Sequence, residues 1–157
     1  MISVLILGES NKTFSPLIDE NESISFLQVS ESSNLLSLSY SWINGYFSQD
    51  KIYVVCTQSE VGKVKKSCKG INEANIIVEP EKINNSVSVF FASMVIEKID
   101  PEETVLFFPV GIFFPPEFKM GKWLYKVEET TEKDWVVIPT VLLNRNDKDV
   151  EYIDAGK

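Results

Sequence analysis

The chain alternates short, continuous apolar runs with longer segments in which apolar residues recur every three or four positions. Each short run fits a strand that is buried on both faces, because such a strand needs apolar side chains on both of its sides. The predicted strands are Ile2–Leu7, Ile52–Cys56, Ala74–Val78 and Val105–Pro109, and Trp135–Thr140 and Val141–Leu143 are also β-like.

The segments between these runs carry the periodicity and the end signals of helices. Leu35, Leu38 and Trp42 lie at helical spacing after Asn34, a residue type that favours the N-cap position. The predicted helices span residues 34–47, 59–70, 85–99 and 120–127. Strands that alternate with helices of about 10–15 residues predict a mainly parallel sheet with helices on both faces, which is a doubly wound α/β fold.

In such a sheet, ligands bind beyond the carboxyl ends of the strands. The loops to consider are therefore Gly8–Pro16, Glu79–Asn85 and Val110–Pro116. The first of them is a Gly/Ser/Thr-containing turn after a strand, which is the usual setting of a phosphate-binding loop. This loop, however, has one glycine, one acid and no arginine.

The composition narrows the possible ligands. The 157 residues, with 44% hydrophobic and 24% charged residues, are typical of one globular domain that spans residues 1–157. The net charge of −8 argues against a general nucleic-acid surface and against an anionic membrane surface. A single nucleotide stays open as a ligand, because backbone N–H groups bind phosphate without any basic side chain.

The residues that most often carry chemistry are scarce. The chain has no histidine, which removes the commonest general base and the commonest zinc ligand. Its two cysteines, Cys56 and Cys68, fit neither a CxxC motif nor a disulfide framework. No apolar run reaches the ~20 residues that span a bilayer, and no basic segment precedes the first run. We therefore expect a cytoplasmic protein without a disulfide.

Three segments carry a family resemblance. The first, L-G-E-S-N-K-T-F-S-P-L at Leu7–Leu17, aligns without a gap to the pattern A-G-G-x-G-T-R-L-W-P-L. The second, I-I-V-E-P-E-K-I-N-N-S at Ile76–Ser86, aligns to I-I-x-E-P-x-x-R-N-T-A. The third, V-L-F-F-P-V-G-I, aligns to a strand that ends in P-A/S-D-H. In these segments the chain resembles the N-terminal part of the mannose-1-phosphate guanylyltransferases, within the sugar-nucleotidyltransferase family.

The resemblance implies a Rossmann-like fold and a site for a nucleotide or a nucleotide sugar such as GDP-mannose. The family uses Mg²⁺ to join a nucleoside triphosphate to a sugar phosphate, and it releases pyrophosphate. Carried over residue by residue, the nucleotide-binding positions are Leu7, Gly8, Ser10, Lys12, Glu79 and Asn84. The simpler interpretation is that Gly8 only forms a turn and that Asn84 only caps a helix.

The groups that carry the family's chemistry are replaced. Glu9 and Thr13 stand where the family has a glycine and the arginine of its first motif, and Ile24 stands in the place of its active-site lysine. Gly111 takes the position of the Mg²⁺-binding aspartate and offers no carboxylate. The family's second half is missing from this sequence. The chain therefore resembles a degenerate, shortened nucleotidyltransferase domain, with no catalytic residues and no metal cofactor.

Three hypotheses about function follow. The first is a pseudoenzyme that binds a nucleotide or nucleotide sugar weakly or acts as a regulatory partner. The second is an assembly module without a ligand, in which Ile112, Phe113 and Phe114 form an interface with another copy of the chain or with a full-length relative. The third is an active transferase that makes GDP-mannose from GTP and mannose-1-phosphate.

Overall fold

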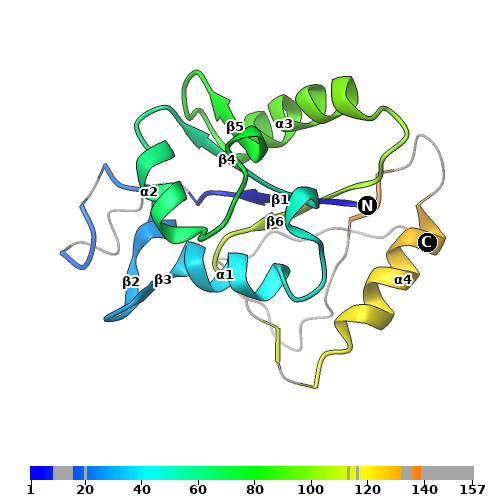
Figure 1. The fold of residues 1–157 in the computed structure, drawn as a ribbon, viewed down its shortest axis with the longest axis horizontal. Coiled ribbons are helices and arrows are strands. Elements are labelled where there is room, and N and C mark those ends of the chain that lie inside the picture. Colours follow the sequence, from blue (N-terminus) through cyan, green and yellow to red (C-terminus); the bar gives the residue numbers. More distant parts are fainter. Residues whose placement is uncertain (9–15, 20, 113, 116, 132–135, 139–157) are drawn as a thin grey trace, which may run out of the picture.

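A computed structural model describes residues 1–8, 16–19, 21–112, 114–115, 117–131 and 136–138. The centre of this part of the chain is a four-stranded sheet in which each neighbouring pair of strands is parallel (Figure 1). In spatial order the strands are β5 (Ile76–Glu79), β4 (Ile52–Thr57), β1 (Ile2–Ile6) and β6 (Val105–Pro109). The parallel sheet confirms the prediction that was made from the continuous apolar runs.

Helices fill most of the connections between these strands. They are α1 (Leu35–Ile43), α2 (Val61–Ser67), α3 (Asn85–Ile99) and α4 (Met120–Thr130), with 3₁₀ turns η2 (Ile24–Phe26), η3 (Gln49–Lys51) and η4 (Glu73–Asn75). Two short strands, β2 (Gln28–Ser30) and β3 (Ser33–Asn34), pair antiparallel ahead of α1.

The predicted β-like segment at Trp135–Thr140 is wrong where the structure describes it. Residues 136–138 lie in no strand. The side chains of Val136 and Ile138 are 85% and 64% exposed, so they lack the burial that stabilises an apolar strand. The rest of this segment and Val141–Leu143 lie outside the described residues.

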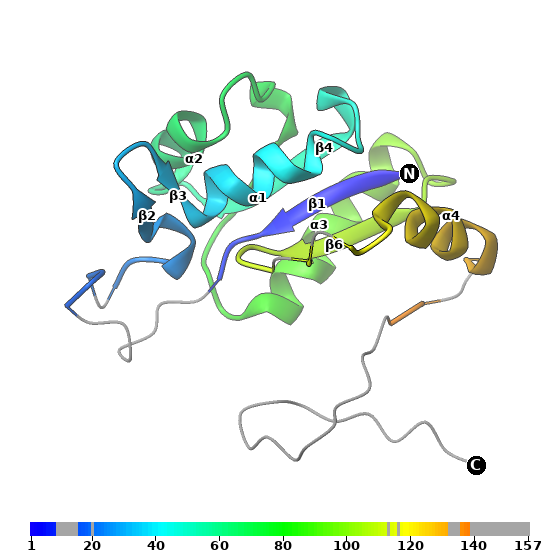
Figure 2. The ribbon, with the colours of Figure 1, turned by 90° about the horizontal axis from the view of Figure 1, so that it is seen from below.

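The alternation of side chains along each strand divides the core into two layers. On one face, Leu5 and Val54 pack with residues of α1, α2 and α4. On the other face, Val4 and Val55 pack with residues of α3. Figure 1 shows α3 above the strands and α1 below them, and in Figure 2, which looks from the α1 side, α3 lies behind the strands. The sheet is therefore covered on both faces.

The order of the strands identifies the fold. The chain moves from β1 to β4 and then to β5 in one direction, and it returns through α3 to β6 on the opposite side of β1. This is a doubly wound, Rossmann-like arrangement, and its strand order reverses between β1 and β6. Ligands of such sheets bind where the strand order reverses, so the loops after β1 and β6 are the first place to look for a site.

None of the described helices is long and apolar enough to cross a lipid bilayer.

Candidate functional site

A cavity of about 680 Å³ opens beyond the carboxyl ends of β1, β4 and β5. Its size falls within the range of about 300–1,000 Å³ that is usual for small-molecule sites. The lining residues are Gly8, Asp19, Asn21, Glu22, Ser23, Phe26, Thr57, Ser59, Glu60, Lys63, Lys82 and Ile83. The cavity therefore lies at the carboxyl edge of the sheet, on the β4 and β5 side of β1, and its described lining includes no residue from the loop after β6.

Two serines beside Ile24 bond the backbone of Gly8, at the start of the loop after β1. The Gly8 N–H donates to Ser25 Oγ over 2.8 Å, and Ser23 Oγ donates to the Gly8 carbonyl over 2.5 Å. A Cβ atom at position 8 would lie 2.6 Å from Ile24 Cγ2, so only glycine fits without movement of the Ile24 side chain. The amide that a phosphate would need at this position is thus already used in a protein hydrogen bond.

A serine also bonds the backbone at the start of the loop after β6. The Gly111 N–H donates to Ser39 Oγ over 3.2 Å, and the Val110 N–H donates to the Ile6 carbonyl over 2.9 Å. Gly111 has a φ of +96°, which is a conformation that favours glycine. Gly111 has no side chain and so offers Mg²⁺ no carboxylate. Among the described residues, no cluster of three His, Cys, Asp or Glu side chains could hold a metal ion.

Glu79 lies at the end of β5, is 2% exposed and does not line the cavity. Its Oε2 accepts a hydrogen bond from Ser88 Oγ at 2.8 Å. Its Oε1 lies 3.8 Å from Lys82 Nζ and has no hydrogen-bond donor among the described residues. The carboxylate therefore depends on the Lys82 charge, because a buried charge without a partner is costly.

Lys82 links the loop between β5 and α3 to the end of β1 through hydrogen bonds. Its ammonium donates to the Leu7 carbonyl at 3.0 Å, to Ser88 Oγ at 3.0 Å and to Asn85 Oδ1 at 3.2 Å. An ammonium has three N–H donors, and all three are used here. Lys82 can contact a ligand in the cavity only through its charge or after it releases one of these acceptors.

Other ionic groups of the cavity also pair with groups of the protein itself. Lys63 Nζ lies 2.5 Å from Glu22 Oε1 and 5.4 Å from the centre of the Phe26 ring. The Glu60 carboxylate accepts from the Thr57 N–H at 2.9 Å and from the Thr57 hydroxyl at 2.8 Å. Because the described part of the lining holds three acids and two lysines, it favours hydroxyl and amino groups over phosphate.

The structure separates the predicted nucleotide-binding residues. Gly8 lines the cavity, whereas Leu7 is buried and reaches the site through its carbonyl, which accepts from Lys82. Asn84 caps α3, because its Oδ1 accepts from the Val87 N–H at 2.9 Å, as the simpler interpretation predicted. Ser10 and Lys12 lie outside the described residues.

Some residues of the site were missed or misplaced by sequence reasoning. Glu79 was expected at the rim of a pocket, but it does not line the cavity, and its buried carboxylate pairs with Lys82, which does. Lys82 follows it by three residues, and this spacing was the only available signal for the pair. Ser23, Ser25 and Ser39 gave no signal at all, since the loops they bond are far from them in sequence.

The segment proposed as an interface lies partly in the core. Phe114 stacks between Trp42 and Phe118, with ring centres 5.1 and 4.6 Å apart, and is half-buried. Ile112 is exposed, and Phe113 lies outside the described residues.

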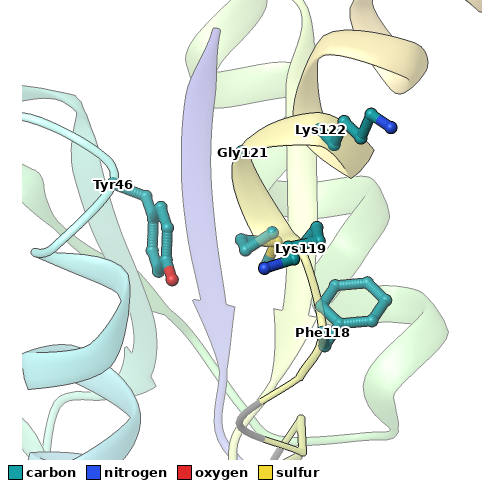
Figure 3. Close-up of a pocket in the computed structure, with 6 residues that line it drawn as sticks. Tyr46, Phe118, Lys119, Gly121 and Lys122 are labelled. Atoms are coloured by element: carbon teal, nitrogen blue, oxygen red, sulfur yellow. The ribbon is translucent and has the colours of Figure 1, made fainter.

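A second cavity of about 630 Å³ lies between Tyr46 and the start of α4 (Figure 3). Its described lining shares no residue with that of the first cavity.

Both cysteines are free and buried, as expected from their spacing. Burial raises the pKa of the Cys56 thiol, and that of the Cys68 thiol, to about 12. Both groups are therefore neutral thiols at pH 7 and pack as small apolar side chains. They are poor nucleophiles, because the nucleophile is the thiolate.

The fold and the cavity together define the class of protein: a Rossmann-like α/β protein with a small-molecule-sized cavity at the carboxyl edge of a parallel sheet. Neither a family model nor a curated protein matches the chain in sequence.

Proposed function

We propose that the chain is a non-catalytic protein of the nucleotidyltransferase type that binds a nucleotide sugar weakly at the carboxyl edge of its sheet. The observation that carries this proposal is the cavity of about 680 Å³. Its lining includes Gly8, which follows β1, and Lys82, which lies in the loop after β5. These are two of the loops in which the sequence resembles the mannose-1-phosphate guanylyltransferases.

The polar groups at the carboxyl edge of the sheet favour binding over chemistry. The Gly8 and Gly111 amides already donate to serines, and the three donors of Lys82 are already used. Loss of one preorganised donor typically costs about 10²–10³ in rate, and here Gly111 also replaces the metal-binding carboxylate. The same arguments predict weak binding, because little remains to neutralise the phosphates.

The sugar and the base would supply most of the contacts. Asp19 and Asn21 in the lining present groups that pair with hydroxyl and amino groups, and Phe26 gives an apolar wall. Hydroxyl-rich ligands suit such a surface because each hydroxyl both donates and accepts. The buried, reduced cysteines agree with the expected cytoplasmic location, where thiols stay reduced.

Isothermal calorimetry with GDP-mannose, GTP and mannose-1-phosphate, each with and without Mg²⁺, tests the proposal. We expect heat with GDP-mannose that does not depend on Mg²⁺. The variant Ser59→Trp fills the cavity from an exposed turn and should abolish this heat, whereas Ser32→Trp, in an exposed turn outside the cavity, should keep it.

Two results would overturn the proposal. The absence of heat with all three ligands at millimolar concentration would remove the binding function. Release of pyrophosphate from GTP and mannose-1-phosphate would show that the chain is an active transferase.

A further inference from the structure

Helix α3 covers one face of the sheet, and its opposite side carries an exposed apolar row. We call this row the α3 stripe: Ile83, just before the helix, and Val87, Phe90 and Met94 within it. Their exposed fractions are 64%, 36%, 66% and 44%. The inner side of the same helix packs Ala92 and Ile96 against the sheet, so the stripe takes no part in the core.

The stripe is unusual for its lack of charge. The segment from Ile83 to Ile96 contains no charged residue, although 24% of the chain is charged and the net charge is −8. Two copies of such an acidic protein repel each other over most of their surface. They approach with least repulsion where both surfaces are neutral, and a neutral apolar row gives a charged partner nothing to recognise.

The spacing of the stripe is self-complementary. Successive members are separated by four, three and four residues, and this order reads the same in both directions. When two α3 helices pack antiparallel about a two-fold axis, Val87 of one copy faces Phe90 of the other, and Ile83 faces Met94. Two-fold interfaces use the same patch on both copies, so a pattern of this kind fits a second copy of the chain.

The area of the stripe sets the strength of the contact. With side chains of this size, the four exposed fractions leave about 400 Å² of apolar surface per copy. A stable interface buries about 800 Å² per partner, so the stripe, with about half of that area, supports only a weak dimer.

We infer that the α3 stripe is a homodimer interface in which two α3 helices pack antiparallel. This interface lies on a different element from Ile112 and Phe114. Ile83 also lines the cavity, but no observation that carries the inference concerns a bound ligand, so the interface does not depend on the ligand proposed above.

Sedimentation equilibrium of the full chain tests the inference. We expect a monomer–dimer equilibrium in samples from about 5 to about 500 μM, because an interface of this size associates only weakly. Phe90→Glu should abolish the dimer. Tyr125→Glu is the matched control, because Tyr125 is also an aromatic residue on a helix and is equally exposed at 66%. Circular dichroism should show the same helix content in both variants.

A mixture of two variants tests the antiparallel register. Phe90→Glu and Val87→Lys should each be monomeric alone, and their mixture should dimerise, because the carboxylate introduced at position 90 of one copy then faces the ammonium introduced at position 87 of the other. Wild-type chain that stays monomeric throughout the range refutes the inference, whatever else covers α3. Loss of the dimer in Tyr125→Glu, or failure of the mixture to associate, would also refute it.

Discussion

Replacement of Lys82 by methionine should destabilise the protein by about 2–3 kcal/mol, because it leaves the Glu79 carboxylate buried without a counter-charge. Methionine keeps the apolar stem of the side chain and removes only the ammonium. The change withdraws a charge 3.8 Å from Glu79 Oε1 and a donor 3.0 Å from the Leu7 carbonyl. The end of β1 and the start of α3 then lose the hydrogen bonds through which Lys82 links them.

The magnitude follows from the burial of the two partners. Removal of one member of a fully buried ion pair costs about 3–5 kcal/mol. Glu79 is 2% exposed, but the Lys82 side chain is 21% exposed and lines the cavity, so water can enter and hydrate part of the orphaned charge. This hydration lowers the expected cost toward about 2–3 kcal/mol.

Urea unfolding at pH 7, followed by tryptophan fluorescence, measures the change. Lys126→Met is the matched control: it breaks an ion pair at the same spacing, with Glu129, on the exposed side of α4. This variant should shift the unfolding midpoint far less, because exposed pairs contribute little. In a double-mutant cycle, Lys82→Met and Glu79→Gln should couple by about 1–2 kcal/mol. A cost below about 0.5 kcal/mol for Lys82→Met, or coupling near zero, would refute the reasoning.

Three further predictions concern Gly8, Gly111 and the ion pair between Lys51 and Glu103. Gly8→Ala should cost about 1–3 kcal/mol in urea unfolding because its Cβ meets a side chain at 2.6 Å, whereas Gly62→Ala, in α2 with nothing within 4 Å, should be neutral or stabilising. Gly111→Asp should destabilise by about 1–3 kcal/mol at its positive φ and should give no Mg²⁺ heat in calorimetry; metal binding by this variant would contradict the structure. The hydrogen bond from Lys51 holds the pKa of Glu103 below its usual range, so its stabilising effect is present above the ordinary glutamate pKa and is lost as the pH falls through the lowered value. Unfolding of Glu103→Gln should therefore depend less on pH in that acidic range than unfolding of the wild type.

The sequence predicts the sheet well because a parallel strand is buried on both faces and must be apolar throughout. The predicted strand Val105–Pro109 and the predicted helix over residues 85–99 coincide with β6 and α3. The prediction over residues 59–70 is too long, since α2 spans only Val61–Ser67. The carboxylate of Glu60 bonds the Thr57 backbone and hydroxyl, so the residues before α2 form a turn instead of a first helical turn.

The site was less predictable because its character depends on contacts between distant segments. The sequence indicates the loops after β1, β5 and β6, since each follows an apolar run. It does not indicate that serines 17 and 72 residues away bond the Gly8 and Gly111 amides. Gly8 thus means different things in sequence and in structure. In the sequence it suggests a free phosphate-binding amide, and in the structure that amide is already paired with Ser25.

Ile83 connects the two proposed surfaces of the molecule. It lines the cavity at the carboxyl edge and is also the first member of the α3 stripe. When its side chain packs against Met94 of a second copy, the cavity loses an apolar wall. A ligand that uses this wall and a second copy that buries it therefore compete, and the coupling between them must be equal in both directions.

GDP-mannose should consequently weaken the dimer about fivefold, which is at the low end of measured couplings and is consistent with one shared aliphatic side chain. Sedimentation equilibrium with and without saturating GDP-mannose measures the shift. Ser59→Trp is the control, because a chain with a filled cavity should dimerise equally in both conditions. A dimer that GDP-mannose leaves unchanged or strengthens, in a chain that binds it, would show that Ile83 does not move between the two surfaces.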